Sequence, residues 1–403
     1  MSQSSWDGRP LAGPGTKIGG TSLLLFEVLQ GACRLKINDH PSAVPRWGCQ
    51  PRDTEDSNYP LESLISDLNG FLDAPWWTRV WTIQESVVGK EPVFFYQTAA
   101  APWALILEAA STLEAHVSDC CTPYLRNSAL PGYANATFAL IRQVQDIQRA
   151  RGVYRTLRSS QPSVRALENA LGPNVIAPKG QAAGLTSQAL LQHLQTYRVR
   201  QATDPRDKIY ALLPLVKNTE PFTIYPDYGD STEEAYLMTA KAIIKASDSL
   251  DILAAASILP SSPRNLALPS WCPDWSATST FYSSSVSQLR SLQWYNASPG
   301  ATPRVCFPAD EPWRLDTDGV LVDSTATLSE DYGAYDGDRA LWKRLYSWSC
   351  LAPTATWLDF CRTVRADVWT REGYHSFYRM GKDLQRKSAH ERHWRDPATG
   401  EPA

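Results

Sequence analysis

Apolar residues recur every three or four positions over long stretches of this chain, and this spacing limits the fold more than any other feature of the sequence. The pattern is clearest from Leu61 to Leu72, where Pro60 suits the first turn of a helix. Similar stripes run from Trp103 to Val117 and from Phe138 to Ile147. We therefore expect a fold that is mainly helical.

The residues after this first helix predict a second helix and a strand. Asp73-Ala74-Pro75 indicates a break, because the residue before a proline is disfavoured in the helical conformation. Pro75 then suits the start of a helix that reaches Val88, with Gly89 as its C-terminal cap. Pro92 to Tyr96 is aromatic and β-branched, which predicts a short buried strand and hence a remaining piece of an α/β layer.

Two later helix starts carry capping signals. Asp204 followed by Pro205 predicts the N-cap of a helix over Ile209 to Leu213. Ser231 to Glu234 fits a capping box, in which a side chain and a backbone N–H at each end bond reciprocally. A further helix is expected from Ser187 to Tyr197.

Asp318-Gly319 is typical of a hairpin turn, here between strands over Trp313 to Asp316 and Val320 to Asp323. These signals divide the chain into five predicted segments. They are 1–57 (divergent, with Gly- and Pro-rich stretches), 58–100 (helices and a strand), 101–303 (mostly helical), 304–381 (a small β/α region) and 382–403 (a polar tail).

Charge and hydropathy exclude several classes of function. The 39 basic residues nearly balance the 42 acidic ones, so the formal charge of −3 favours neither nucleic acid nor an anionic membrane as a partner. The apolar run Leu23 to Phe26 is far shorter than the ~20 residues that span a bilayer. No basic segment precedes it, as a signal peptide would require. We expect a cytoplasmic protein without a membrane span.

The eight cysteines are scattered and form no Cys-x-x-Cys pair, so we expect them to be reduced and individually buried. His390 and His393 share a helical spacing, but they lie in the polar tail without a third ligand. No metal site and no cofactor are therefore expected.

Three stretches carry a family resemblance: Arg79 to Glu85 (RVWTIQE), Ala202 to Leu213 (ATDPRDKIYALL) and Leu268 to Trp275 (LPSWCPDW). In this order and spacing they resemble the end of the heterokaryon incompatibility domain of fungal proteins and the region that follows it. The second motif is the most specific of the three. Pro75-Trp76-Trp77 is similar to the usual lead-in to the first motif, and Tyr225 to Tyr228 to the usual sequence after the second.

The resemblance covers about residues 60 to 370 and leaves out the beginning of the chain. Members of the family open with Tyr-x-Ala-Leu-Ser-Tyr-x-Trp-Gly and then Trp-x-Asp-x-x-Cys-Ile-Asn-Gln, and neither occurs between Met1 and Ala74. We therefore expect an N-terminally truncated or degenerate member.

Each motif also has a purely structural interpretation, which we favour. Trp76, Trp77 and Trp81 are large anchors that suit a core. Trp271 to Trp275 has no metal-ligand spacing and a single thiol, so packing is its expected role.

Asp204 to Asp207 is explained by helix capping, with Arg206 and Lys208 free to pair with those acids. Five arginines form a basic group for which a solvated helix face is a commoner explanation than contact with RNA or another polyanion. They are Arg149, Arg151, Arg155, Arg158 and Arg165.

Glu85 is the one residue for which the resemblance implies chemistry. The family is related to Toll/interleukin-1 receptor (TIR) domains, and Trp81-x-x-x-Glu85 matches the spacing that holds the catalytic glutamate in NAD-cleaving members of that superfamily. This resemblance implies a catalytic Glu85 and a nucleotide-contacting Trp81, which a four-residue spacing would place on one helix face. A solvated surface glutamate is the plainer interpretation and the one we prefer.

The expected fold is α/β and predominantly helical, with a TIR-like helix–strand unit followed by a mostly helical region and a small β element. The resemblance implies non-self recognition and programmed cell death in fungi, exerted through protein partners by a non-catalytic or vestigial member. The alternative is an NAD glycohydrolase that uses Glu85, with NAD as substrate. It would need residues 1–57 to replace missing strands, for example by a parallel strand over Leu23 to Leu35 beside Val93 to Tyr96.

Overall fold

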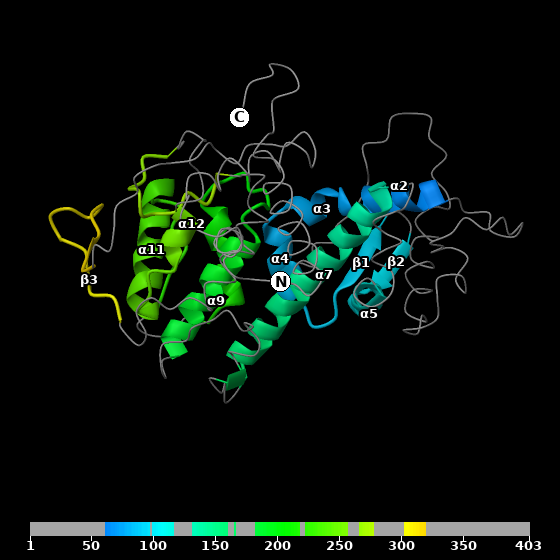
Figure 1. Ribbon diagram of the computed structural model, residues 1–403, viewed down its shortest axis with the longest axis horizontal. Coiled ribbons are helices and arrows are strands. Elements are labelled where there is room, and N and C mark those ends of the chain that lie inside the picture. The colour runs from blue at the N-terminus through cyan, green and yellow to red at the C-terminus, as the bar shows by residue number, and fades with distance from the viewer. Residues whose placement is uncertain are drawn as a thin grey trace, which may run out of the picture. The chain divides into compact units, whose positions relative to one another are not determined.

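A computed structural model of the chain describes residues 61–96, 99–116, 131–159, 165–166, 182–217, 222–256, 266–277 and 302–319 (Figure 1). The chain divides into two compact units, residues 1–282 with 300–316 and residues 283–299 with 317–403. The described residues other than 317–319 belong to the first unit. Helices predominate among them and strands are few and short, which confirms the predicted α/β, mainly helical class.

The first helix, α2 (Leu61–Leu72), has the predicted bounds and buries Leu68, Phe71 and Leu72. The single helix predicted over 75–88 is wrong, because α3 (Pro75–Thr78) and α4 (Trp81–Val88) are separate helices.

The break between α3 and α4 has a tertiary cause. Arg79 is extended, with φ −83° and ψ 141°, and it forms a parallel bridge with Gln201. The Val80 N–H donates to the Gln201 carbonyl at 2.9 Å instead of continuing a helix. Gly89 does end α4 as predicted, but its φ of −59° shows that no left-handed cap is formed there.

Two short strands follow α4. β1 (Val93–Tyr96) pairs antiparallel with β2 (Ala99–Pro102) to give a two-stranded sheet. The prediction of a buried strand is therefore only half right. Phe94 points inward and is buried, whereas Phe95 points outward and is 62% exposed.

The inner face of the hairpin packs into a group of rings that we call the aromatic cluster. Its members are Phe71, Trp76, Trp77, Phe94 and Trp103. The ring centroids of Phe71 and Trp77 lie 5.3 Å apart, edge to face, and those of Trp77 and Phe94 lie 5.8 Å apart, stacked. Trp77 is 3% exposed, which confirms its predicted place in the core.

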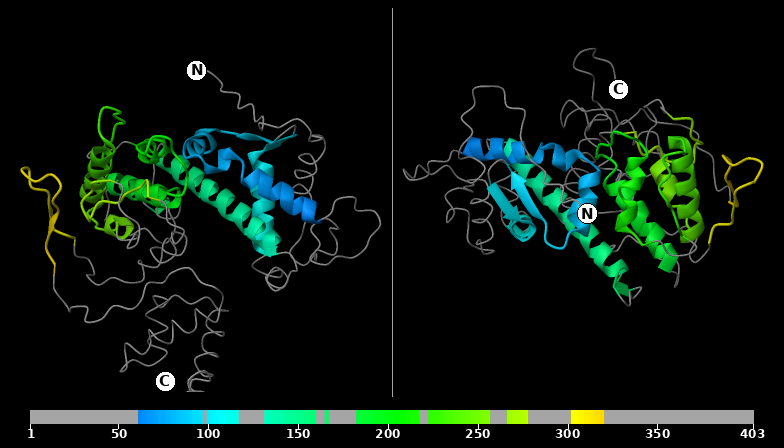
Figure 2. Two further views of the ribbon diagram at one scale, coloured as in Figure 1. Left: turned by 90° about the horizontal axis from the view of Figure 1, so that it is seen from above. Right: turned by 180° about the vertical axis from the view of Figure 1, so that it is seen from behind.

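Two helices follow the hairpin. α5 (Trp103–His116) and the long α7 (Pro131–Leu157) pack against each other, and α7 also contacts α2 and α4 (Figure 2). In the stripe predicted for α7, Phe138 is misplaced, since it is 45% exposed. Phe138 is two positions from Ala136 and from Leu140, which occupy the buried face, so its side chain points to the opposite side of the helix.

A second group of helices forms around α9 (Ala182–Thr196) and α11 (Thr232–Ser247), which pack side by side (Figure 2). The capping box predicted at the start of α11 is confirmed, with Ser231 and Glu234 bonded reciprocally. The short helices nearby are α10 (Asp207–Tyr210), the 3-10 helix η3 (Leu213–Leu215) and α12 (Ile252–Ala256).

The predicted strand over Trp313 to Asp316 is shifted. Trp313 lies in a turn, and β4 (Asp316–Thr317) pairs with β3 (Val305–Cys306). Val320 to Asp323 and Leu23 to Leu35 lie outside the described residues. Cys306 is exposed, which contradicts its predicted burial, because its two-residue strand lies at the surface.

Candidate functional site

Trp81 and Glu85, the two predicted site residues, both lie on α4. The side chain of Glu85 is exposed. Trp81 is partly buried, and its indole N–H donates to Oδ2 of Asp207 at 3.0 Å. The first motif is therefore joined to the second by a hydrogen bond that spans 126 positions of sequence. A catalytic Glu85 and a nucleotide-contacting Trp81 stay predictions.

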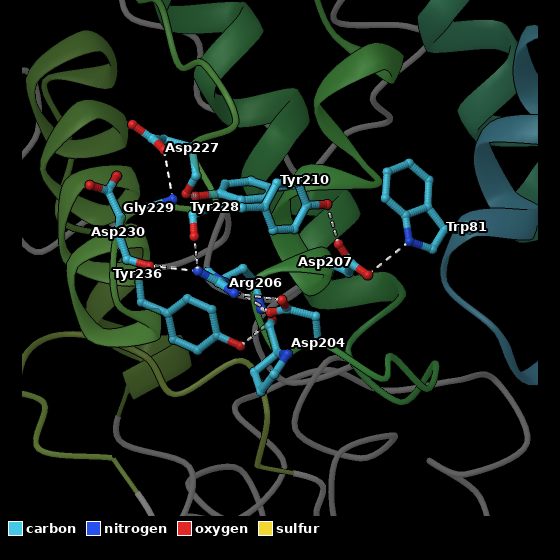
Figure 3. A network of polar contacts seen from close by, with 11 residues as sticks. Trp81, Asp204, Arg206, Asp207, Tyr210, Asp227, Tyr228, Gly229, Asp230 and Tyr236 are labelled. Carbon is cyan, nitrogen blue, oxygen red and sulfur yellow. Dashed lines mark hydrogen bonds and ion pairs between the residues drawn. The ribbon is translucent and has the colours of Figure 1, made fainter.

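Asp207 lies at the centre of this contact (Figure 3). Its other oxygen, Oδ1, accepts a 2.6 Å hydrogen bond from the Tyr228 hydroxyl. Because the carboxylate holds that proton, the pKa of Tyr228 rises to about 12. The Tyr228 ring stands edge-on to Tyr210, with centroids 5.2 Å apart. One carboxylate thus ties α4 to the segment around 228.

Asp204 does not act as the predicted N-cap. Helix α10 begins at Asp207, its N-cap residue is Arg206, and no side chain caps it. Asp204 instead accepts three bonds from Arg206, from the backbone N–H (2.9 Å), Nε (3.0 Å) and Nη2 (2.7 Å). These bonds hold the pKa of Asp204 below its usual value. The attraction of the guanidinium outcompetes a simple cap, because a bidentate ion pair is the stronger interaction.

The remaining donor of Arg206 fixes the next loop. Nη1 donates to the carbonyls of Tyr228 and Asp230 at 2.8 and 2.6 Å, and the guanidinium carbon lies 5.2 Å from the centre of the Tyr228 ring. The predicted pairing of Arg206 with Asp204 is confirmed. We call the residues Trp81, Asp204, Arg206, Asp207, Tyr210 and Tyr228 the junction (Figure 3).

Lys208 does not pair with those acids as expected. It is buried, and its ammonium donates to the carbonyls of Arg198 (2.8 Å) and Arg200. Burial lowers its pKa to about 8, with a smaller contribution from the charge of Arg198. Both carbonyls belong to the turn that follows α9, so the lysine supplies donors to backbone oxygens of that turn.

The third motif packs, as predicted. Cys272 and Trp275 are each 1% exposed. Arg198 donates to the carbonyls of Ala255 (3.0 Å) and Asp274, and it lies 5.3 Å from the centre of the Trp275 ring. Two atoms, Oδ2 of Asp274 and Nε1 of Trp275, are buried without a hydrogen-bond partner in the described structure.

The basic group does not form one solvated face. Arg151 is 2% exposed and lies under the end of α4, where its guanidinium donates to the carbonyls of Ser86, Gly89 (2.9 Å) and Lys90 (2.9 Å). A helix leaves its last carbonyls without partners, and Arg151 supplies donors for them. Of the other four, Arg155, Arg158 and Arg165 are exposed.

Within the described ranges, no three His, Cys, Asp or Glu side chains gather so that they could hold a metal ion. None of the helices described there is long and apolar enough to cross a membrane. His390 and His393 lie outside those ranges.

Sequence reasoning missed Gln201, Arg198 and the role of Arg151. A glutamine that bonds through its backbone leaves no signal in the side-chain pattern, and a buried arginine resembles a surface one when only its neighbours in sequence are known. Tyr228 could have been found from the sequence, since it belongs to the stretch that usually follows the second motif.

The junction fixes segments of this chain to one another. Both carboxylate oxygens of Asp204 and of Asp207 accept bonds from this chain. Its guanidinium donates to one carboxylate and two carbonyls.

No family model matches this chain, and no solved structure matches it. A curated Neurospora crassa protein, heterokaryon incompatibility protein 6, OR allele, is 25% identical over 217 residues. The match covers 51% of this chain and 28% of that protein, so the chain spans well under two thirds of its relative. This similarity supports the resemblance to heterokaryon incompatibility proteins that the three motifs indicated.

Proposed function

We propose that this chain acts in fungal heterokaryon incompatibility, the recognition of non-self after cell fusion that ends in programmed cell death. It acts by binding a protein partner in the cytoplasm and not by catalysis. The similarity to a heterokaryon incompatibility protein supports the process. The contacts of the junction support the mode of action.

The observation that carries the non-catalytic proposal is the use of the second motif. Asp204, Arg206, Asp207 and Lys208 are its charged side chains. Arg206, Asp207 and Lys208 bond to other parts of the chain, and Asp204 holds the guanidinium of Arg206. The most specific motif therefore acts as a tertiary brace. Bracing of this kind holds a surface in shape for a partner, and binding surfaces are more exact when rigid elements present them.

The candidate surface is the loop beside the junction. Tyr225 is 74% exposed and Tyr228 52% exposed, and tyrosine is enriched where proteins bind one another. Arg206 and Asp207 fix the position of Tyr228, so less entropy is lost when a partner binds.

The direct test is incubation of the purified 403-residue chain with NAD, with nicotinamide followed by chromatography. We expect no release above that of buffer, and Glu85→Gln should leave both the trace and the melting temperature unchanged. Steady release that Glu85→Gln abolishes would overturn the proposal and establish the glycohydrolase.

The glycohydrolase remains the second candidate because of one observation. Glu85 is exposed, and α4 is fixed at its start by Asp207 and at its end by Arg151. A carboxylate on a rigid helix meets one requirement of catalysis, although a pocket that fixes the ribose is a second.

A cellular test separates the process from the mechanism. The chain is expressed in a filamentous fungus, strains are fused pairwise, and dead fusion cells are counted with a vital dye. We expect death with the parent and with Glu85→Gln, and loss of death with Tyr225→Ala. Death in neither parent nor variants, against any strain tested, would contradict the incompatibility role.

A further inference from the structure

The outer face of the β1–β2 hairpin is apolar. In the register of the two strands, Val93 stands opposite Pro102 and Phe95 opposite Ala100, and these four residues share the face that points away from the aromatic cluster. Val93 is 50% exposed and Phe95 62% exposed. An antiparallel sheet with one solvated face normally carries polar residues there. This face carries none.

The size of the face limits what covers it. Separate proteins that form a stable complex bury about 800 Å² on each side, far more than four side chains with two small members can supply. A segment of the same chain needs less area, because its tether gives an effective concentration on the order of millimolar. A tethered occupant therefore fits this face better than a second copy or a free partner.

One segment of the chain has the composition and the reach. Residues 1–60 lead directly into α2, and α2 packs beside the hairpin, where the Phe71 and Tyr96 rings lie 5.3 Å apart. That segment holds the apolar stretch Leu23 to Leu35. The residues between it and α2 can extend over roughly 80 Å, so distance does not prevent the contact.

We propose that residues 23–35 pack on the outer face of the hairpin, with their apolar side chains against Val93 and Phe95. The contact gives the hairpin a second apolar layer. A two-stranded sheet has little stability of its own, and here it would be held from both faces. The proposal goes beyond the proposed function and does not depend on it.

Photo-crosslinking of the full chain tests the occupant. p-Benzoylphenylalanine replaces Phe95, with little change of shape, and the irradiated protein is digested and analysed by mass spectrometry. We expect a crosslink to a peptide within residues 23–35 in protein of monomer mass. The matched control carries the same group at Met238 on α11, which is 60% exposed, and should not reach that peptide. A crosslinked dimer, a different peptide, or no crosslink would overturn the proposal.

Thermal melts give an independent test without the probe. We expect Phe95→Asp and Leu25→Asp each to lower the melting temperature by several degrees, and the double variant to melt no lower than either. Met238→Asp, at nearly the same exposure as Phe95, should barely change it. Equal effects of Phe95→Asp and Met238→Asp, or additive effects in the double variant, would show that the face is bare.

Discussion

The aromatic cluster and the junction hold neighbouring parts of the chain by opposite means. In the aromatic cluster, rings from α2, α3, β1 and the start of α5 meet at centroid distances of 4.6 to 5.8 Å. In the junction, two carboxylates accept hydrogen bonds from a guanidinium, an indole N–H and a tyrosine hydroxyl at 2.6 to 3.0 Å. The aromatic cluster is stabilised by the apolar area that it buries, and the junction by hydrogen bonds of favourable length and angle.

This difference teaches what each region tolerates. Ring packing depends on volume and is nearly independent of pH and salt. The junction depends on the charge of Asp204 and Asp207, and its ion pair lies near the surface, where each contact contributes little alone. We therefore expect large effects from single changes in the aromatic cluster and small, pH-sensitive ones in the junction.

The largest effect is expected from the centre of the aromatic cluster. Trp77→Ala removes a ring that is 3% exposed and should lower the free energy of unfolding by ~3 to 5 kcal/mol. Urea denaturation followed by circular dichroism measures it. Trp77→Phe keeps part of the packing and should cost clearly less. A loss under 1 kcal/mol for Trp77→Ala would show that the cluster is not a core.

The stability of the chain in acid tests a titratable side chain that is buried, as the rings of the aromatic cluster are. His193 on α9 is buried, and burial lowers its pKa from 6.5 to about 4. The unfolded chain then binds the proton first as pH falls, so stability is intact above about 6.5 and is lost toward 4, by up to about 3 kcal/mol. Melts at pH 7 and 5 check this. The His193→Gln variant cannot take up this proton, so its stability should differ less between pH 7 and pH 5. If the variant loses as much stability as the parent, His193 is not the group responsible.

Asp204 tests whether charge or capping matters in the junction. Asp204→Ala removes an ion pair near the surface and a hydrogen bond to the Arg206 N–H, so it should cost about 0.5 to 2 kcal/mol by urea denaturation. Asp204→Asn keeps an acceptor for the Arg206 N–H but loses the ion pair, so it should recover only part of this. The pKa of Asp204 lies below its usual value, so its contribution is present at neutral pH and lost only in strong acid. If Asp204→Asn is as stable as the parent, the charge of Asp204 does not matter and helix capping explains its role.

The bond between the first two motifs is smaller still. A double-mutant cycle of Trp81→Phe and Asp207→Asn should give a coupling energy of about 0.5 to 1.5 kcal/mol, because one partly buried hydrogen bond is removed. The matched pair Trp81→Phe with Asp230→Asn should show no coupling, since Asp230 contacts Arg206 through its carbonyl. Zero coupling in the first cycle would show that this hydrogen bond does not join the two motifs.

The smallest change should stabilise the chain. Gly152 lies inside α7, and no heavy atom would come within 4 Å of an added Cβ. Gly152→Ala should therefore raise the free energy of unfolding by about 0.5 to 1 kcal/mol. Gly70→Ala is the contrasting variant, because its Cβ would meet the Tyr96 hydroxyl at 2.9 Å. A loss at Gly152 equal to that at Gly70 would contradict the packing described for α7.

The sequence by itself determined the elements whose signals are local. Helical periodicity located α2, α5 and the middle of α7, and the capping box located the start of α11, because these depend on residues within one or two turns. The core position of Trp77 followed from its size. The three motifs also gave the family resemblance that the Neurospora crassa relative supports.

Only the tertiary structure decided what those motifs contact. Gln201 breaks the helix predicted over 75–88, Arg206 draws Asp204 away from a cap, and Arg151 turns from a surface charge into the cap of α4. In two of these cases the partner lies on another element. In the third, the charged side chain of Arg206 binds Asp204 more strongly than a helix cap would. Such bonds exist only after folding brings the segments together, so no window of sequence contains them.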